Sequence, residues 1–264
     1  MAEETSNLIK EYKRFCEFKE QGLKDGKLDL SSETWFFPTT MVPLIAFLNS
    51  SNIEVRLPRN DSVRKYFEIM SGRRGSFSKT DKSYMPVVEL PEERDQVTLL
   101  LERIQKLCNR GKDMGGIDAF AYLLAEMTDN IYEHSQFSKA YIFAQRYATK
   151  KFSEIAIFDN GITIEGSYKK AGFDMEDRSA ILEALQGIST KDEERGFGLR
   201  TSVSLFTKGL KGEFMIVSGS EAVYINKDVQ KLYKLDKSLY CQGTLIGVRL
   251  PYPSTEVNMY DYIA

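Results

Sequence analysis

Three polar residues recur at helical spacing in FAYLLAEMTDNIYEHS (120–135), where Glu126, Asn130 and His134 follow one another at intervals of four. Residues four apart lie on one face of a helix, about 6 Å from each other. A carboxylate there can take a proton from a water or a hydroxyl group. An amide oxygen is a ligand that Mg²⁺ accepts beside phosphate oxygens. The row therefore fits a general base one helical turn from a metal that bridges phosphates.

The same segment has an apolar face that predicts how the helix is oriented. Four apolar residues fall within a narrow arc at about 100° per residue, and they are Phe120, Leu124, Met127 and Ile131. We expect this arc to face the core, with the polar row about 90° from its centre. A solvated flank explains the polar row equally well when the helix is considered alone, and a single histidine is usually structural.

The apolar run SEIAIFDNGITI (153–164) predicts a strand that ends in Asp159-Asn160-Gly161. A carboxylate at a strand end can accept a hydrogen bond from an exocyclic amine such as N6 of adenine, and Gly161 would let the base approach the backbone. However, Asn-Gly between two apolar runs is also the strongest short signal for a β-hairpin. Taken alone, this stretch favours the hairpin.

A glycine-rich stretch, GISTKDEERGFGLRTSVSLF (187–206), places Gly196 and Gly198 just before a helix that starts near Leu199. Glycine amides and a helix N-terminus together bind anions, and Thr190 and Lys191 add donors. The stretch is neither a P-loop nor a dinucleotide-binding fingerprint, because the spacing of both motifs is absent.

A fourth signal is Gly243-Thr244, at the entrance to the last expected strand in CQGTLIGVRLP (241–251). An ordinary turn before a strand explains it as well as a site does. The other expected strands are 140–147, 154–158, 213–218 and 222–226, and helices are expected near 92–110, 117–134 and 176–186 and from 199 onward.

The front of the chain shows a different pattern, with a helix at 4–21 and a β-α-β-α order over 27–70. A Gly-, Ser- and Arg-rich connector follows at 71–86. We therefore expect an N-terminal helix at 1–26, a small α/β unit with its connector at 27–86, and an α+β domain at 87–264.

Composition excludes several classes of protein. The 264 residues carry 36 basic and 38 acidic side chains, a net charge of −2, so no bulk positive field favours nucleic acid. No apolar run is long enough to span a membrane. One histidine and three scattered cysteines argue against a zinc site and fit reduced thiols in a cytoplasmic protein.

The order of the four signals resembles the ATP-binding domain of the GHKL superfamily (gyrase, Hsp90, histidine kinase, MutL), over roughly 92–252. The resemblance implies a Bergerat fold, a two-layer α/β sandwich whose mixed sheet has helices on one face, with ATP and Mg²⁺ as ligands. It assigns Mg²⁺ to Asn130, adenine to Asp159, Gly161 and Thr244, and phosphates to Gly196, Gly198 and Leu199. It places Thr190 and Lys191 in a mobile lid.

Within the superfamily, TDNIYEHS is most similar to anti-sigma-factor serine kinases and to stand-alone histidine-kinase-like ATPases. The resemblance implies that Glu126 is the catalytic base of an ATPase or a serine/threonine kinase with a protein partner in signalling. The alternative is a nucleotide-gated binding module with little catalysis. The front unit loosely resembles a STAS-like module, and the sequence leaves open a homodimer and the role of His134.

Overall fold

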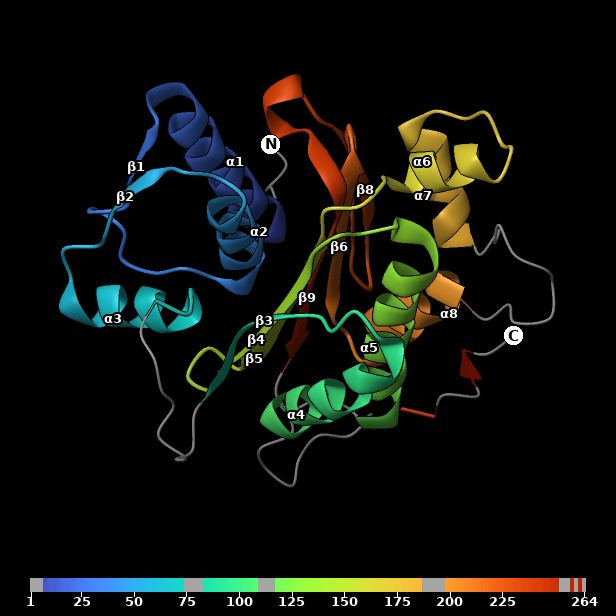
Figure 1. Cartoon of the computed structure of the whole chain (residues 1–264). Coiled ribbons are helices and arrows are strands. Elements are labelled where there is room, and N and C mark those ends of the chain that lie inside the picture. Colours follow the sequence, from blue (N-terminus) through green and yellow to red (C-terminus); the bar gives the residue numbers. More distant parts are fainter. Residues whose placement is uncertain are drawn as a thin grey trace, which may run out of the picture.

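The computed structural model describes residues 7–73, 83–108, 117–186, 198–251, 257–258 and 261–262. Its helices are α1 (Asn7–Asp25), α2 (Pro38–Asn49), α3 (Asp61–Met70), α4 (Thr98–Cys108), α5 (Ile117–Asn130), α6 (Ile164–Lys170), α7 (Asp177–Gln186) and α8 (Gly198–Ser204). Short turns of helix are η1 (Arg94–Val97), η2 (Ile131–Ser135), η4 (Leu205–Gly209) and η5 (Lys237–Leu239). Figure 1 shows these elements around one large sheet.

The large sheet has seven strands in the order β3-β4-β5-β9-β6-β7-β8. They are β3 (Tyr84–Glu89), β4 (Ala140–Tyr147), β5 (Phe152–Asp159), β6 (Glu213–Gly219), β7 (Glu221–Ile225), β8 (Gln230–Lys234) and β9 (Cys241–Pro251). Every neighbouring pair is antiparallel. The five expected strands are confirmed, but the expectation of a mixed sheet is wrong. β5 and β6 run in the same direction, but β9 lies between them and pairs antiparallel with both.

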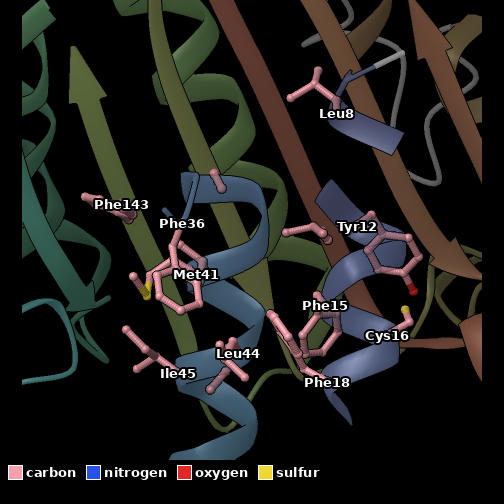
Figure 2. Packing of buried hydrophobic residues seen from close by; sticks show 14 of the residues in the cluster. Leu8, Tyr12, Phe15, Cys16, Phe18, Phe36, Met41, Leu44, Ile45 and Phe143 are labelled. Atoms are coloured by element: carbon pink, nitrogen blue, oxygen red, sulfur yellow. The ribbon is translucent and has the colours of Figure 1, made fainter. Parts of the chain in front are cut away.

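Side chains alternate between the two faces of this sheet, and each face has its own core. One face packs on α4, α5 and α8, through residues such as Ile157, Ile216 and Ile246. The other face packs on α1 and α2, through residues such as Phe143 and Met215. Figure 2 shows α1 and α2 directing Tyr12, Phe15 and Met41 into this second core.

The sheet is therefore covered on both faces, and the expectation of a two-layer sandwich with helices on one face only is wrong. The physical reason lies in the strands, which alternate between two sets of apolar residues rather than between apolar and polar ones. An antiparallel sheet with one solvated face would show apolar-in and polar-out alternation. The N-terminal helices supply the third layer.

The front unit contains a second, two-stranded sheet, in which β1 (Lys27–Asp29) pairs in parallel with β2 (Glu54–Arg56). The expected β-α-β-α order is present, and α3 packs its apolar residues into the core that α1 and α2 share with the large sheet. The boundary expected after residue 86 falls inside β3, whose first residue, Tyr84, already pairs with Gln145 of β4.

No helix in the described part of the chain combines the length and the apolar character that crossing a membrane requires.

Candidate functional site

Asp159 is the last residue of β5 and its side chain is buried, with only 1% of the residue exposed. Its Oδ1 atom accepts a hydrogen bond from the backbone N–H of Gly161 at 2.9 Å. Burial raises the pKa of this carboxyl group to about 7, although hydrogen-bonding groups of Gly161, Ser135 and Thr244 act in the opposite direction. The structure therefore holds a carboxylate with spare acceptor capacity in a place where water does not solvate it.

The Asn-Gly pair after Asp159 does not form a hairpin, so that interpretation is wrong. The Oδ1 atom of Asn160 accepts hydrogen bonds from the backbone N–H groups of Ser138 and Lys139, at 3.1 and 2.9 Å. These bonds tie the end of β5 to the start of β4, and the chain then enters α6, where Thr163 caps the helix through the N–H of Gly166. Local sequence could not distinguish the two outcomes, because the partners of Asn160 lie more than 20 residues away.

Gly161 lets the end of β5 pack against the end of η2, the helical turn that continues α5. The backbone N–H of Ile162 donates to the carbonyl oxygen of Ser135 at 2.7 Å. A Cβ atom added at Gly161 would lie 2.0 Å from that same oxygen, so no side chain fits without displacing backbone. The carboxylate of Asp159 is therefore positioned beside the C-terminal end of the helix that carries the polar row.

Replacing Gly161 by alanine is expected to destabilise the protein by about 1–3 kcal/mol, because the new methyl group overpacks a backbone contact. Urea unfolding measures the change. Gly166→Ala is the control, since a Cβ atom there meets its nearest neighbour at 3.3 Å inside a helix. Equal stabilities for both variants would contradict the close approach.

A row of polar side chains crosses the sheet next to Asp159. In register, Asp159 pairs with Thr244, Thr244 with Ser218, and Ser218 with Glu221. Paired residues of neighbouring strands point to the same face, here the face covered by α5 and α8. The Oγ atom of Ser218 lies 3.2 Å from Oγ1 of Thr244 and is itself buried. Sequence reasoning found Asp159 and Thr244 but missed Ser218 and Glu221, which stand in strands without any motif.

The polar row runs from α5 into η2, and its residues Glu126, Asn130 and His134 are half-buried. The apolar arc predicted for this helix is buried as expected. Burial raises the pKa of Glu126, and the negative charges of Asp129 and Glu133 raise it further. A carboxyl group in this setting holds its proton more readily than an exposed one, which suits a group that must take a proton at neutral pH.

Arg94 of η1 lies against the acidic side of α5 and was missed by sequence analysis. Its Nε atom donates to Oδ1 of Asp129 at 2.8 Å, and its NH1 atom to Oε1 of Glu133 at 3.3 Å. The positive charge of Arg94 acts to lower the pKa of Glu126. An arginine 35 residues before its partner gives no signal in a sequence pattern.

The start of α8 is the remaining described part of the expected site. Gly198 opens this helix with a positive φ of 37°, and Leu199 follows, packed against the core that α5 shares with the sheet. The helices touch through Tyr122 of α5. Burial raises the pKa of Tyr122, the charge of Glu126 raises it further, and a hydrogen bond with Ser202 of α8 acts to lower it. Thr190, Lys191 and Gly196 lie outside the described residues.

Within the ranges that the structure describes, no group of three His, Cys, Asp or Glu side chains could hold a metal by itself. The Asn130 amide has no hydrogen bond or ion pair with another described residue. One free amide oxygen fits a cation whose other ligands come from a nucleotide and water.

Comparison with known proteins adds no assignment to this geometry, because no protein-family model matches the chain and neither does any curated protein.

Proposed function

We propose that this protein binds Mg-ATP in a site of the GHKL type. The observation that carries the proposal is the buried carboxylate of Asp159, which ends a strand beside the end of η2 and pairs in register with Thr244. The Gly161 amide donates to one of its oxygens, and groups of Ser135 and Thr244 also hydrogen-bond to the carboxylate, which has about four acceptor positions. The remaining acceptor capacity suits the amino group of adenine, which donates and carries no charge.

The phosphate end of the nucleotide is assigned to the residues at the start of α8. In this proposal the backbone N–H groups of Gly198 and Leu199 face the phosphates, because the first N–H groups of a helix have no partner within it. The resemblance also assigns Gly196 to the phosphates and Thr190 and Lys191 to a lid, and these three residues lie outside the described ranges. Asn130 supplies an oxygen ligand to Mg²⁺, which neutralises charge on the phosphates when it is bound.

Glu126 is the proposed general base. It lies one helical turn from Asn130 on the half-buried face of α5, and its raised pKa favours accepting a proton from a water or from a partner's serine or threonine hydroxyl. The oxygen of the deprotonated water or hydroxyl group then attacks the γ-phosphate in line, and ADP leaves. The proposed activity is ATP hydrolysis or phosphotransfer to a protein in signalling.

Incubation with γ-labelled ATP, followed by separation of free phosphate from labelled protein, distinguishes hydrolysis from phosphotransfer. Glu126→Ala is expected to bind ATP with wild-type affinity but to lose product formation by about 100-fold or more, since a positioned acid or base contributes about 10²–10⁴-fold. Glu102→Ala is the matched control, because Glu102 lies exposed on α4 beside Lys106.

Each other outcome has a definite meaning. Equal, slow rates in wild type and Glu126→Ala, with ATP bound by both, favour the nucleotide-gated binding module. Absence of ATP binding by the wild-type protein in calorimetry contradicts the proposed function altogether.

A further inference from the structure

Ser218 is a buried hydroxyl group that joins three segments around Asp159. It accepts a hydrogen bond from the backbone N–H of Ile164, at the start of α6, at 2.9 Å. It donates to the carbonyl oxygen of Gly243 at 3.0 Å and lies 3.2 Å from the hydroxyl oxygen of Thr244. These contacts use all of the hydrogen-bonding capacity of one serine hydroxyl, which is one donor and two acceptor lone pairs.

The single proton of Ser218 is committed to Gly243. A carbonyl oxygen can only accept, and the pairing of β6 with β9 shifts register at this point, between Ser218 and Gly219. Gly243 adopts a positive φ of 82° there, in a bulge where regular ladder bonds are interrupted. A buried carbonyl oxygen needs a donor, and the serine hydroxyl supplies it.

The hydrogen bonds already made by Ser218 decide which hydroxyl group donates in its contact with Thr244. Because the Ser218 proton goes to Gly243 and the Ile164 amide occupies one lone pair, Ser218 meets Thr244 as an acceptor. The Thr244 hydroxyl therefore donates to Ser218, and only its lone pairs remain for other partners. Thr244 is half-buried and pairs in register with Asp159, whereas Ser218 is only 1% exposed.

We propose that Ser218 is a positioning residue that holds Thr244 as a hydrogen-bond acceptor, so that Thr244 and Asp159 together select a purine with an amino group at carbon 6. This inference rests on the proposed ATP site. Asp159 and Thr244 are then two neighbouring acceptors. They suit an amino group, which only donates, and a water molecule can also donate to Thr244. They oppose a carbonyl oxygen at carbon 6, which only accepts.

The experiment compares the affinities of ATP and of inosine triphosphate, which has a carbonyl oxygen at carbon 6, by calorimetry in the presence of Mg²⁺. Wild type is expected to prefer ATP. Ser218→Ala frees the Thr244 hydroxyl to rotate and donate, so the ratio of the two affinities is expected to fall by about tenfold, the size of one hydrogen bond in a buried site.

A double-mutant cycle separates positioning from a general structural role. Thr244→Val removes the hydroxyl and is expected to lower the same ratio, and Ser218→Ala in that background should change it no further. Loss of structure alone would weaken the binding of both nucleotides and leave the ratio of their affinities as in wild type. Ser153→Ala is the control, because Ser153 is also buried in the sheet but lies at the far end of β5.

If Ser218→Ala does not fold, Ser218→Cys carries the test, because a thiol of similar size is a weak donor and acceptor. The ratio of the affinities for ATP and inosine triphosphate in Ser218→Cys should lie between the ratios of wild type and Thr244→Val. A wild-type protein that binds ATP, with a ratio unchanged in the Ser218 variants, contradicts this inference and leaves the proposed function standing. A wild-type protein that binds neither nucleotide overturns both.

Discussion

Asp159→Asn is expected to weaken ATP binding by about 100-fold, because a hydrogen bond to a charged acceptor contributes about 1.5–3 kcal/mol and the new amide group places a donor beside the adenine amino group. Calorimetry at pH 8, where the carboxylate of the wild type is ionised, measures the loss. Asp228→Asn is the matched control, since the side chain of Asp228 is exposed in the turn after β7 and lies beside Lys227. An unchanged affinity in Asp159→Asn removes the adenine assignment.

In the absence of nucleotide, Asp159→Asn is expected to make the folded protein more stable at neutral pH, although it weakens ATP binding. The pKa of Asp159 is about 7 in the folded protein and about 3.9 in an unfolded chain. Between these values the folded state binds a proton that the unfolded state does not, so stability contributed by Asp159 is present below pH 4 and is lost as pH rises through 7. An asparagine does not titrate.

The free energy of unfolding of Asp159→Asn should therefore increase relative to wild type from pH 4 to pH 8, by up to about 4 kcal/mol at about 1.4 kcal/mol per pKa unit. Urea unfolding across this pH range gives the difference. A constant difference between the two proteins would show that the carboxyl group titrates normally. The combination of weaker ATP binding and higher stability marks a residue kept for a ligand rather than for folding.

Arg249→Met is expected to destabilise the protein by about 3–5 kcal/mol, because it leaves a buried carboxylate without its counter-ion. The Nε atom of Arg249 donates to Oε2 of Glu154 at 2.8 Å, and Glu154 is completely buried. The other oxygen of Glu154 accepts from the backbone N–H and the hydroxyl of Thr39, at 3.0 and 2.7 Å. Thr39 stands at the start of α2, so this contact joins the N-terminal layer to the centre of the sheet.

The pH dependence of the Arg249→Met defect has a definite sign. Burial raises the pKa of Glu154, and Arg249 acts to lower it. Without Arg249 the pKa rises further, the carboxyl group becomes neutral more easily, and the defect should shrink as pH falls. The double variant Glu154→Gln with Arg249→Met should recover most of the stability, because glutamine still accepts from Thr39 and carries no charge. A cost below about 1 kcal/mol for the single variant would contradict the burial of the pair.

The sequence alone determined most of the secondary structure and the residue types of the candidate site. Strands such as β4 and β6 are short, mostly apolar runs whose expected bounds agree with the structure to within one residue, and the apolar arc of α5 predicted which face is buried. β3 and β8 were missed. β3 includes Pro86, which weakens a strand signal, and β8 has no fully buried residue.

Only the tertiary structure decided how these parts meet. The pairing of β5, β9 and β6 brings Asp159, Thr244 and Ser218 into one row, although they stand far apart along the chain. The hairpin at Asn160 failed to form because its side chain bonds with Ser138 and Lys139, and burial rather than residue type raises the pKa of Asp159. The third layer likewise forms because α1 and α2 pack on the sheet face opposite α5. Local propensity acts over a few residues, whereas register, burial and layer order are set by contacts between segments that no window of sequence contains.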